Sequence, residues 1–360
     1  MFDIKHSISN QYFFHERFHH LIPGIEIKLK DQGIGNHLCL LSSGTTSQAP
    51  KGFALSLTAV FESALAVNRT LGLSSMDRWG LTLPPYHIGG LAILARSELL
   101  SRAPAYLLPW RPDELKEGIT KEKVTAISLV PAQIYDLVQK GVSAPSTLKV
   151  VLAGGDFLSE ALKKSAEDLG WPIIRTFGMT EVASSLAIGG DLKQGLKLLP
   201  LHEIKTDTSN QLWIKTRSLF SAKFSLKEDW EVVMTEKLLD QGGFYPSSDR
   251  VELTSQGIIP LGRNDGHFKS SGHLISLFEI KEALDAFLLR KRLWGRMEIF
   301  LRPDDRKGQI LCLYHESNLG REALEFESSL SPLRFDVKQE VIVLPKTDLG
   351  KTRLPLSGPS

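Results

Sequence analysis

Apolar runs alternate with helical patterns along the first half of the chain, and this order predicts an α/β protein. Short apolar runs typical of buried strands cover Leu38 to Leu41, Trp79 to Leu83, Val124 to Leu129, Leu148 to Ala153 and Pro172 to Arg175. Apolar residues recur at helical spacing in Thr58 to Leu73, Leu91 to Leu100, Gln133 to Lys140 and Glu160 to Leu169. We therefore predict a doubly wound, mostly parallel sheet with its ligand-binding loops at the carboxyl ends of the strands.

The pattern changes after Gly189-Gly190 to short β-rich segments, such as Gln211 to Lys215 and Trp230 to Thr235, which predict a small β subdomain. A polar, glycine-flanked stretch from Leu261 to Gly266 is suited to a hinge. Beyond it the sequence predicts a helix at Leu277 to Leu289 and strands at Ile299 to Arg302, Ile310 to Tyr314 and Val341 to Leu344. We expect a large N-terminal domain over residues 1–263 and a small, mobile α+β C-terminal domain over residues 264–360.

Composition excludes several classes of protein. The 360 residues exceed a usual single core, and Lys+Arg outnumber Asp+Glu by only 43 to 41, so the charge indicates no nucleic-acid partner. No window approaches the roughly 20 apolar residues that span a bilayer, and residues 1–21 lack the apolar core of a signal peptide. The two cysteines, Cys39 and Cys312, each lie in an apolar run, as buried free thiols do. These features predict a cytoplasmic protein.

The segment from Ser42 to Gly52 has the composition of a phosphate-binding loop. Glycines let the backbone approach an anion, hydroxyls donate hydrogen bonds, and Lys51 supplies a positive charge. The spacing differs from that of a Walker-type P-loop. The candidate phosphate-binding residues are Ser42, Ser43, Gly44, Thr45, Thr46 and Lys51. Taken by itself, the segment is equally consistent with a polar surface turn.

Together with four further segments, this loop resembles the acyl-adenylate-forming, or AMP-binding, superfamily of acyl- and aryl-CoA ligases. The segments, in the order of the family, are Ser42 to Gly52, Pro84 to Gly90, Phe177 to Glu181, Ser248-Asp249 with Gly262 to Asp265, and Leu344 to Lys351. The resemblance implies a ligase that uses ATP, Mg²⁺ and coenzyme A. A carboxylate first displaces pyrophosphate from ATP, and coenzyme A then displaces AMP from the acyl group.

The resemblance also implies a role for each nucleotide-site residue. Thr180 lies near the α-phosphate, and Glu181 holds Mg²⁺. Without the residues that precede it, Glu181 would be interpreted as a solvent-exposed acidic residue at the start of a helix. Phe177 packs its ring against adenine, beside Gly178. Asp249 accepts hydrogen bonds from the ribose, with Arg263 nearby. Gly154 and Gly155 match a backbone segment that lies beside the adenine. For Gly154, an ordinary turn between a strand and a helix remains an alternative.

Lys351 occupies the position of the family's mobile catalytic lysine, which bridges the acyl carboxylate and the α-phosphate during adenylation. Composition alone predicts only a solvated tail there. The resemblance implies that the small domain rotates about a hinge at Asp265 between the two steps. Lys351 then leaves the site, and the loop around Ser270-Ser271-Gly272 enters on the coenzyme A side.

The stretch from Leu83 to Arg96 looks most like the o-succinylbenzoate–CoA ligases of menaquinone synthesis. Arg96 lies on an otherwise apolar helix, and a buried arginine needs an anionic partner, such as the aromatic carboxylate of o-succinylbenzoate. Alternatively, Arg96 points to solvent or pairs near Glu98. His87 is a candidate for the acyl pocket or for a structural role, and Ser184 is a further candidate polar contact.

The chain also departs from the family pattern. Ser47 replaces a glycine in a phosphate loop that is one residue longer than usual, and Arg353 follows Lys351 one position early. Only 41 residues precede Ser42, where most relatives have a further subdomain, so the resemblance implies a shortened N-terminal region. The alternatives are another aryl- or acyl-CoA ligase, or a nucleotide-binding protein without catalysis. A monomer and a homodimer are both compatible with the sequence.

Overall fold

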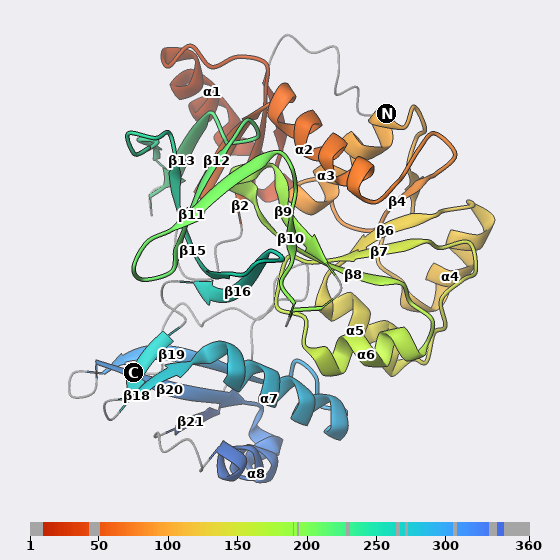
Figure 1. Ribbon diagram of the computed structural model, residues 1–360, viewed down its shortest axis with the longest axis vertical. Helices are drawn as coiled ribbons and strands as arrows, with labels where there is room; N and C mark the ends of the chain where they lie inside the picture. Colours follow the sequence, from red (N-terminus) through yellow and green to blue (C-terminus); the bar gives the residue numbers. More distant parts are fainter. Residues whose placement is uncertain are drawn as a thin grey trace.

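The elements of the chain form two groups that lie one above the other in Figure 1. The computed structural model describes residues 10–42, 51–189, 191–192, 194–227, 231–263, 267–270, 273–304, 308–330 and 337–341. We call the elements up to residue 263 the large lobe and those from residue 267 onward the small lobe. No helix in these described ranges is long and apolar enough to cross a membrane.

A seven-stranded sheet forms the centre of the large lobe, with the order β10-β9-β8-β7-β6-β4-β5. Its strands are β4 (Trp79–Leu81), β5 (Ala105–Tyr106), β6 (Ala126–Leu129), β7 (Val150–Ala153), β8 (Ile173–Met179), β9 (Ser184–Gly189) and β10 (Lys197–Leu198). The five strands from β5 to β8 in this order run parallel, and β9 and β10 add an antiparallel edge. The predicted mostly parallel sheet is confirmed.

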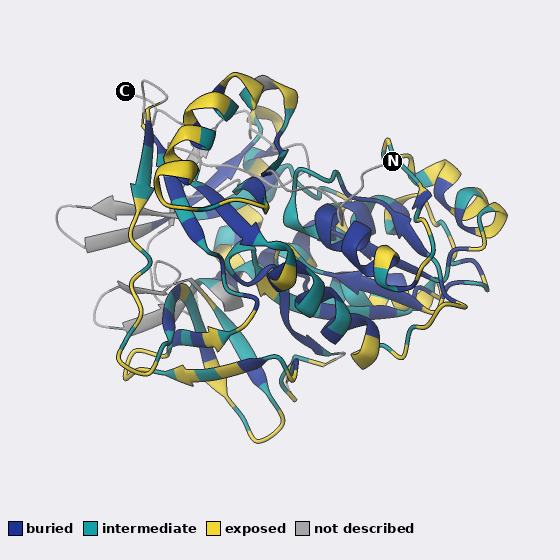
Figure 2. Ribbon diagram, turned by 90° about the horizontal axis from the view of Figure 1, so that it is seen from above, coloured by how far each residue is buried: buried dark blue, intermediate teal, exposed yellow. Residues whose placement is uncertain are grey.

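Helices cover both faces of this sheet, as Figure 1 shows. On one face lie α2 (Leu57–Thr70) and α3 (Ile88–Leu99), and on the other α4 (Pro112–Lys121), α5 (Pro131–Gln139) and α6 (Glu160–Asp168). Ser56 and Ser159 start α2 and α6 by accepting a hydrogen bond from a backbone N–H of the first turn, which is the usual N-cap interaction. The two helical layers sandwich strands that are dark blue, and therefore buried, in Figure 2.

The strands on either side of the predicted phosphate loop belong to a different sheet from the one that the sequence predicts. β2 (His37–Ser42) and β3 (Lys51–Ser56) form an antiparallel hairpin in which Ser42 pairs with Lys51. They belong to a five-stranded sheet with the order β1-β2-β3-β13-β14, which also contains β1 (Gln11–Phe13), β13 (Ala222–Leu226) and β14 (Val232–Thr235). The short helix η1 (Glu16–Leu21) and α1 (Ile22–Asp31) pack against it. The prediction of a strand, a loop and then a helix is therefore wrong here, because β3 intervenes.

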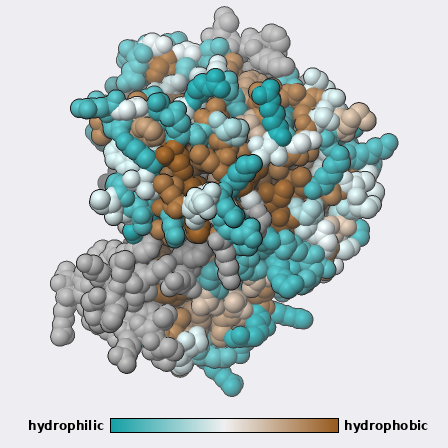
Figure 3. Space-filling model, in the orientation of Figure 1, coloured by the Kyte–Doolittle hydropathy of each residue, from teal (hydrophilic) through white to brown (hydrophobic). Residues whose placement is uncertain are grey.

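The β-rich region after residue 190 contributes to three sheets. β10 lies at the edge of the seven-stranded sheet, and β13 and β14 complete the five-stranded sheet. The remaining strands form a four-stranded antiparallel sheet of β11 (His202–Thr206), β12 (Gln211–Thr216), β15 (Tyr245–Leu253) and β16 (Ile258–Arg263). On the face of the large lobe seen in Figure 3, apolar surface is concentrated near the middle, with polar residues around it.

The small lobe combines a three-stranded sheet, a hairpin and two helices. The sheet has the order β19-β20-β21, with β19 (Met297–Asp304), β20 (Gly308–His315) and β21 (Val337–Val341). The other elements are β17 (His267–Ser270), β18 (His273–Ser276), α7 (Leu277–Lys291), η3 (Ser317–Leu319) and α8 (Gly320–Leu330). Of the strand predicted at Val341 to Leu344, the structure describes only Val341, which is part of β21, and the rest stays a prediction. Cys39 and Cys312 are buried free thiols, one in each lobe, as predicted.

Candidate active site

The predicted adenine-side residues gather where β7 and β8 end and β9 begins. Gly154 and Gly155 follow β7, and Phe177 and Gly178 lie near the end of the neighbouring β8. A Cβ atom on Gly154 would lie 2.8 Å from the carbonyl oxygen of Thr176, and one on Gly178 would lie 1.9 Å from that of Ser184. Both positions therefore require glycine, because the backbones of β7, β8 and β9 approach each other closely.

A strained turn carries Thr180 and Glu181 from β8 to β9. These residues form the short helix η2 (Thr180–Val182), after which Ala183 and Ser184 have φ values of 57° and 116°. Residues other than glycine rarely adopt such values, and strained backbone of this kind clusters at functional sites. The Phe220 N–H donates to the Glu181 carbonyl oxygen at 2.9 Å. Two residues later β13 begins and pairs with β3, so this bond ties the turn to the sheet that carries Lys51.

Three polar groups of the predicted phosphate site have no partner within the described ranges. The Lys51 ammonium, the Thr180 hydroxyl and the half-buried Glu181 carboxylate make neither a hydrogen bond nor an ion pair there. Magnesium bound through substrate phosphates needs only one or two protein carboxylates. Within the same ranges no group of three or more His, Cys, Asp or Glu side chains could hold a metal ion. Glu181 therefore fits as a single protein ligand to a phosphate-bound Mg²⁺.

The two predicted ribose-side residues lie opposite each other on adjacent antiparallel strands. Asp249 of β15 pairs in register with Arg263 of β16. The Asp249 N–H donates to the Ser247 hydroxyl at 3.1 Å, which fixes the backbone at this point. This pairing brings the backbones of the two residues side by side on the four-stranded sheet.

Several predicted site residues lie outside the described ranges and keep the status of predictions. These are Ser43, Gly44, Thr45, Thr46, Asp265, Gly272 and Lys351. For Ser42 and Arg263 the structure describes the strand but not the side chain.

Arg96 of α3 is almost completely buried, with 1% of its surface exposed, so the alternative that it points to solvent is wrong. Its Nη2 donates to the hydroxyls of Ser184 at 3.2 Å and Ser185 at 3.3 Å, and its Nη1 lies 3.4 Å from that of Ser128. The guanidinium also lies over the Trp79 ring, 5.2 Å from its centroid. α3 and β9 thus present an arginine surrounded by neutral donors and acceptors.

Within the described ranges no carboxylate balances the charge of Arg96. Its Nε makes no hydrogen bond, and Glu98 does not pair with it. Burial lowers the pKa of Arg96 to about 9, so the guanidinium still carries its charge at neutral pH. A buried charge without a counter-ion is costly, and a bound anion would supply the missing partner.

His87 lies at the start of α3, apart from the Arg96 contacts. Its extended backbone forms the N-cap, and its ring lies 4.8 Å from the ring of Tyr86. A role for His87 in an acyl pocket remains a prediction.

The sequence did not predict the polar network behind Arg96. Thr176 donates to the Ser185 hydroxyl at 2.9 Å, and His202 Nε2 lies 3.1 Å from the Ser185 carbonyl oxygen. Since that oxygen only accepts, Nε2 carries the proton, and Nδ1 accepts from the Thr216 hydroxyl at 2.9 Å. The available signal was Ser128 within an otherwise apolar strand, but the pairing of β8 with β9 was needed to place the other members.

Replacing His202 with Gln is expected to flatten the pH dependence of stability. Burial lowers the pKa of His202 to about 4, from an ordinary value of about 6.5. The unfolded chain therefore binds the extra proton between these values. This histidine lowers the free energy of unfolding by about 2 kcal/mol as the pH falls from about 7 to about 5. Urea unfolding of both proteins at the two pH values measures the difference. If the free energy of unfolding fell equally in wild type and variant between the two pH values, His202 would not be the cause of the pH dependence.

Comparison with known proteins places this geometry in context. Residues 37–203 match the family of AMP-binding enzymes. The 2-succinylbenzoate–CoA ligase of Lactococcus lactis is 26% identical over 329 residues, which cover 87% of this chain and 68% of that protein. The Staphylococcus aureus enzyme of the same name is 32% identical over 331 residues, covering 87% of this chain and 64% of that protein. The chain thus spans about two thirds of the length of these relatives.

Solved structures show the same fold. The o-succinylbenzoate coenzyme A synthetase of Bacillus subtilis, in complex with the acyl-adenylate intermediate, aligns with a TM-score of 0.71 at 21% identity over 88% of this chain and 67% of that one. Its complex with ATP and magnesium ion aligns with a TM-score of 0.72 at 22% identity over 87% of this chain and 68% of that one. The resemblance to AMP-binding enzymes predicted from the sequence motifs is confirmed.

Proposed function

We propose that this chain is an ATP-dependent acid–thiol ligase, because residues 37–203 match the family of AMP-binding enzymes. In this proposal it adenylates 2-succinylbenzoate and transfers the acyl group to coenzyme A, as the names of the relatives indicate for those proteins. The large lobe binds ATP and the acid, and residues 264–360 form a mobile domain that carries Lys351.

We choose this substrate because of Arg96, whose buried positive charge has no carboxylate partner within the described ranges. A simple fatty or aryl acid has one carboxylate, and that group must reach the α-phosphate. 2-Succinylbenzoate has two, so its succinyl carboxylate can react while its aromatic carboxylate pairs with the buried guanidinium. Arg96 presents a planar fork of donors suited to a carboxylate. The neutral hydroxyls of Ser184 and Ser185 hold that fork in place.

In the first step the succinyl carboxylate attacks the α-phosphorus of ATP in line, and pyrophosphate leaves. The protein contributes mainly position and charge compensation. Lys51 and the hydroxyls of Thr45 and Thr46 bind the phosphates that become pyrophosphate, and Thr180 donates to the α-phosphate. Glu181 would hold Mg²⁺, which would neutralise part of the phosphate charge. Lys351 bridges the carboxylate and the α-phosphate.

In the second step the thiol of coenzyme A attacks the acyl carbon, and AMP leaves. We propose that the small domain turns about Asp265 between the steps, so that Lys351 withdraws and the segment around Gly272 faces the thiol. Phe177, Gly178, Gly155, Asp249 and Arg263 hold the adenosine throughout. His87 lines the acyl pocket in this proposal. We place the enzyme in the cytoplasm, in keeping with its buried free thiols.

Pyrophosphate release across a panel of carboxylic acids tests this function. We expect 2-succinylbenzoate to support release at least tenfold faster than benzoate or a fatty acid, because only it offers Arg96 a second carboxylate. A preference for monocarboxylates would point to another aryl- or acyl-CoA ligase. No release with any acid would instead favour a nucleotide-binding protein without catalysis.

A further inference from the structure

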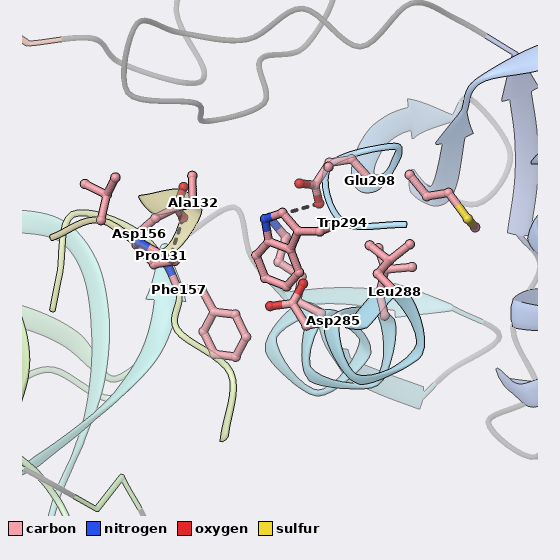
Figure 4. A pocket seen from close by; sticks show the side chains of 13 residues that line it. Pro131, Ala132, Asp156, Phe157, Asp285, Leu288, Trp294 and Glu298 are labelled. Atoms are coloured by element: carbon pink, nitrogen blue, oxygen red, sulfur yellow. Dashed lines mark hydrogen bonds and ion pairs between the residues drawn. The ribbon is translucent and has the colours of Figure 1, made fainter. Parts of the chain in front are cut away.

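The two lobes meet at a small cavity that the mechanism above does not use. On the large-lobe side it is lined by the start of α5 and by Asp156 and Phe157, which follow β7; on the small-lobe side, by α7 and the turn into β19. Figure 4 shows these two sets facing each other, with Asp285, Trp294 and Glu298 across from Asp156 and Phe157. The cavity has a volume of about 70 Å³, enough for a few water molecules.

Trp294 forms the apolar part of this contact. Its ring stacks on Tyr135 of α5, with centroids 5.0 Å apart and planes inclined by 19°. Its backbone N–H donates to the Tyr135 hydroxyl at 3.3 Å. The same side chain packs against the α4–α6 core of the large lobe and against the core of the small lobe. Docking of the lobes therefore partly buries Trp294.

Carboxylates outnumber cations around the cavity. Lys281 Nζ lies 3.5 Å from Glu298 Oε1, and Asp285 lies one turn along α7 from Lys281. Asp156 faces them from the large lobe. Glu282, the other acid on this part of α7, accepts from the Glu160 N–H at 3.4 Å, beside the Glu160–Arg175 ion pair. Within the described ranges the Asp285 carboxylate itself makes no hydrogen bond or ion pair.

The position of Asp285 disfavours its charged form. Burial raises the pKa of Asp285 to about 8, and the negative charges of Glu298, Glu282 and Asp156 act in the same direction, whereas Lys281 opposes them. For Lys281, burial lowers the pKa, but Glu298, Asp156 and Asp285 together raise it above the ordinary value. At neutral pH the docked contact thus contains a charged lysine and a protonated Asp285.

We propose that this contact is a pH-dependent latch, in which the docked lobes hold Asp285 in its protonated form and loss of that proton releases the small lobe. Two of the acids that Asp285 faces belong to its own lobe, and Asp156 belongs to the other. Separation of the lobes removes the repulsion from Asp156 and returns the Asp285 carboxylate to water. The latch requires no substrate, so it goes beyond the proposed ligase activity and does not depend on it.

The direction of the effect follows from proton linkage. An aspartate in water has a pKa of about 4, so docking takes up a proton between about pH 4 and about pH 8. Within that window the docking constant falls by up to about tenfold for each unit of rising pH, and above about pH 8 it levels off. Acidification therefore favours the docked arrangement.

Hydrogen exchange of the Trp294 amide in the full-length protein tests the latch. This N–H donates across the contact, so its protection reports docking even when separation is rare. We expect its protection factor to fall about 50-fold from about pH 6 to about pH 8 in wild type. In Asp285→Asn it should stay constant within about twofold over that range. The amide of Leu313, within the small-lobe sheet, serves as an internal reference.

Two further variants complete the test. Glu325→Gln removes a carboxylate of the same lobe that pairs with Lys291, away from the cavity, and should keep the wild-type profile. Asp156→Asn changes an exposed residue of the other lobe, and the protection factor of the Trp294 amide should fall less with rising pH than in wild type. This variant tests the latch if Asp285→Asn does not fold. A wild-type protection factor that does not change with pH would overturn the latch. So would a wild-type profile in Asp285→Asn or Asp156→Asn.

Discussion

Lys351→Ala is expected to slow pyrophosphate release with 2-succinylbenzoate by about 100-fold or more, which is the scale of loss when one group that stabilises transition-state charge is removed. The lysine is proposed to bridge two negatively charged groups that must approach each other, the acyl carboxylate and the α-phosphate. Once the acyl-adenylate exists, that approach is complete. Thioester formation from presupplied acyl-adenylate should therefore stay within about threefold of wild type, and rapid-quench assays of the two half-reactions measure both rates.

A matched control for this variant is Lys346→Ala, which removes the same charge five residues earlier in the same segment. It should affect neither half-reaction by more than about threefold, because the proposal places Lys346 at neither the carboxylate nor the α-phosphate. Equal losses in the two half-reactions of Lys351→Ala would contradict the role proposed for Lys351. A similar loss in Lys346→Ala would mean that the tail acts through its overall charge.

Arg96→Ala is expected to lower kcat/KM for 2-succinylbenzoate by about 100-fold. The substrate's aromatic carboxylate would then enter a buried site without its partner, which costs about 3 kcal/mol. For 4-oxo-4-phenylbutanoate, which lacks that carboxylate, kcat/KM should change by less than about threefold. Steady-state pyrophosphate release with both acids measures the preference.

Two variants separate a specific loss at Arg96 from a general effect of removing a buried arginine. Arg96→Lys keeps the charge but loses the planar fork, so its preference for the dicarboxylate should be intermediate. Arg175→Ala removes another buried arginine, one that pairs with Glu160 and donates to the Leu158 carbonyl oxygen, and it should lower stability without changing the preference. An unchanged preference in Arg96→Ala would remove Arg96 from the acyl site.

The sequence predicted β4, β6 and β7 of the central sheet because each of these strands is short, apolar and followed by a helical pattern, whereas it did not predict the edge strands β5, β9 and β10. It also predicted that Arg96 lies on an apolar helix. α3 has buried residues all the way from Gly90 to Ser97, so no face of it is left for a solvent-exposed arginine. The sequence leaves the alternatives for Arg96 open because it does not show how α3 packs.

Features that depend on strand pairing could not be predicted. β3 follows the phosphate loop directly, and its pairing with β13 places Phe224 so close to Gly52 that a Cβ atom there would lie 2.0 Å from the ring. The sequence shows the glycine but not the ring that requires it. The same holds for Ser185 and His202, because their contact joins residues 17 positions apart on strands of two different sheets.

The single buried cysteine in each lobe makes the two lobes chemically distinguishable. Cys39 lies on β2 and Cys312 on β20, and both have 0% of their surface exposed. A thiol reagent reacts with a thiolate that it can reach, so neither residue should react until its own lobe opens. Cys39 labelling therefore times the opening of the five-stranded sheet, and Cys312 labelling times that of the small-lobe sheet. The labelling rates of the two native cysteines therefore report local unfolding of each lobe separately, and no further cysteine needs to be introduced.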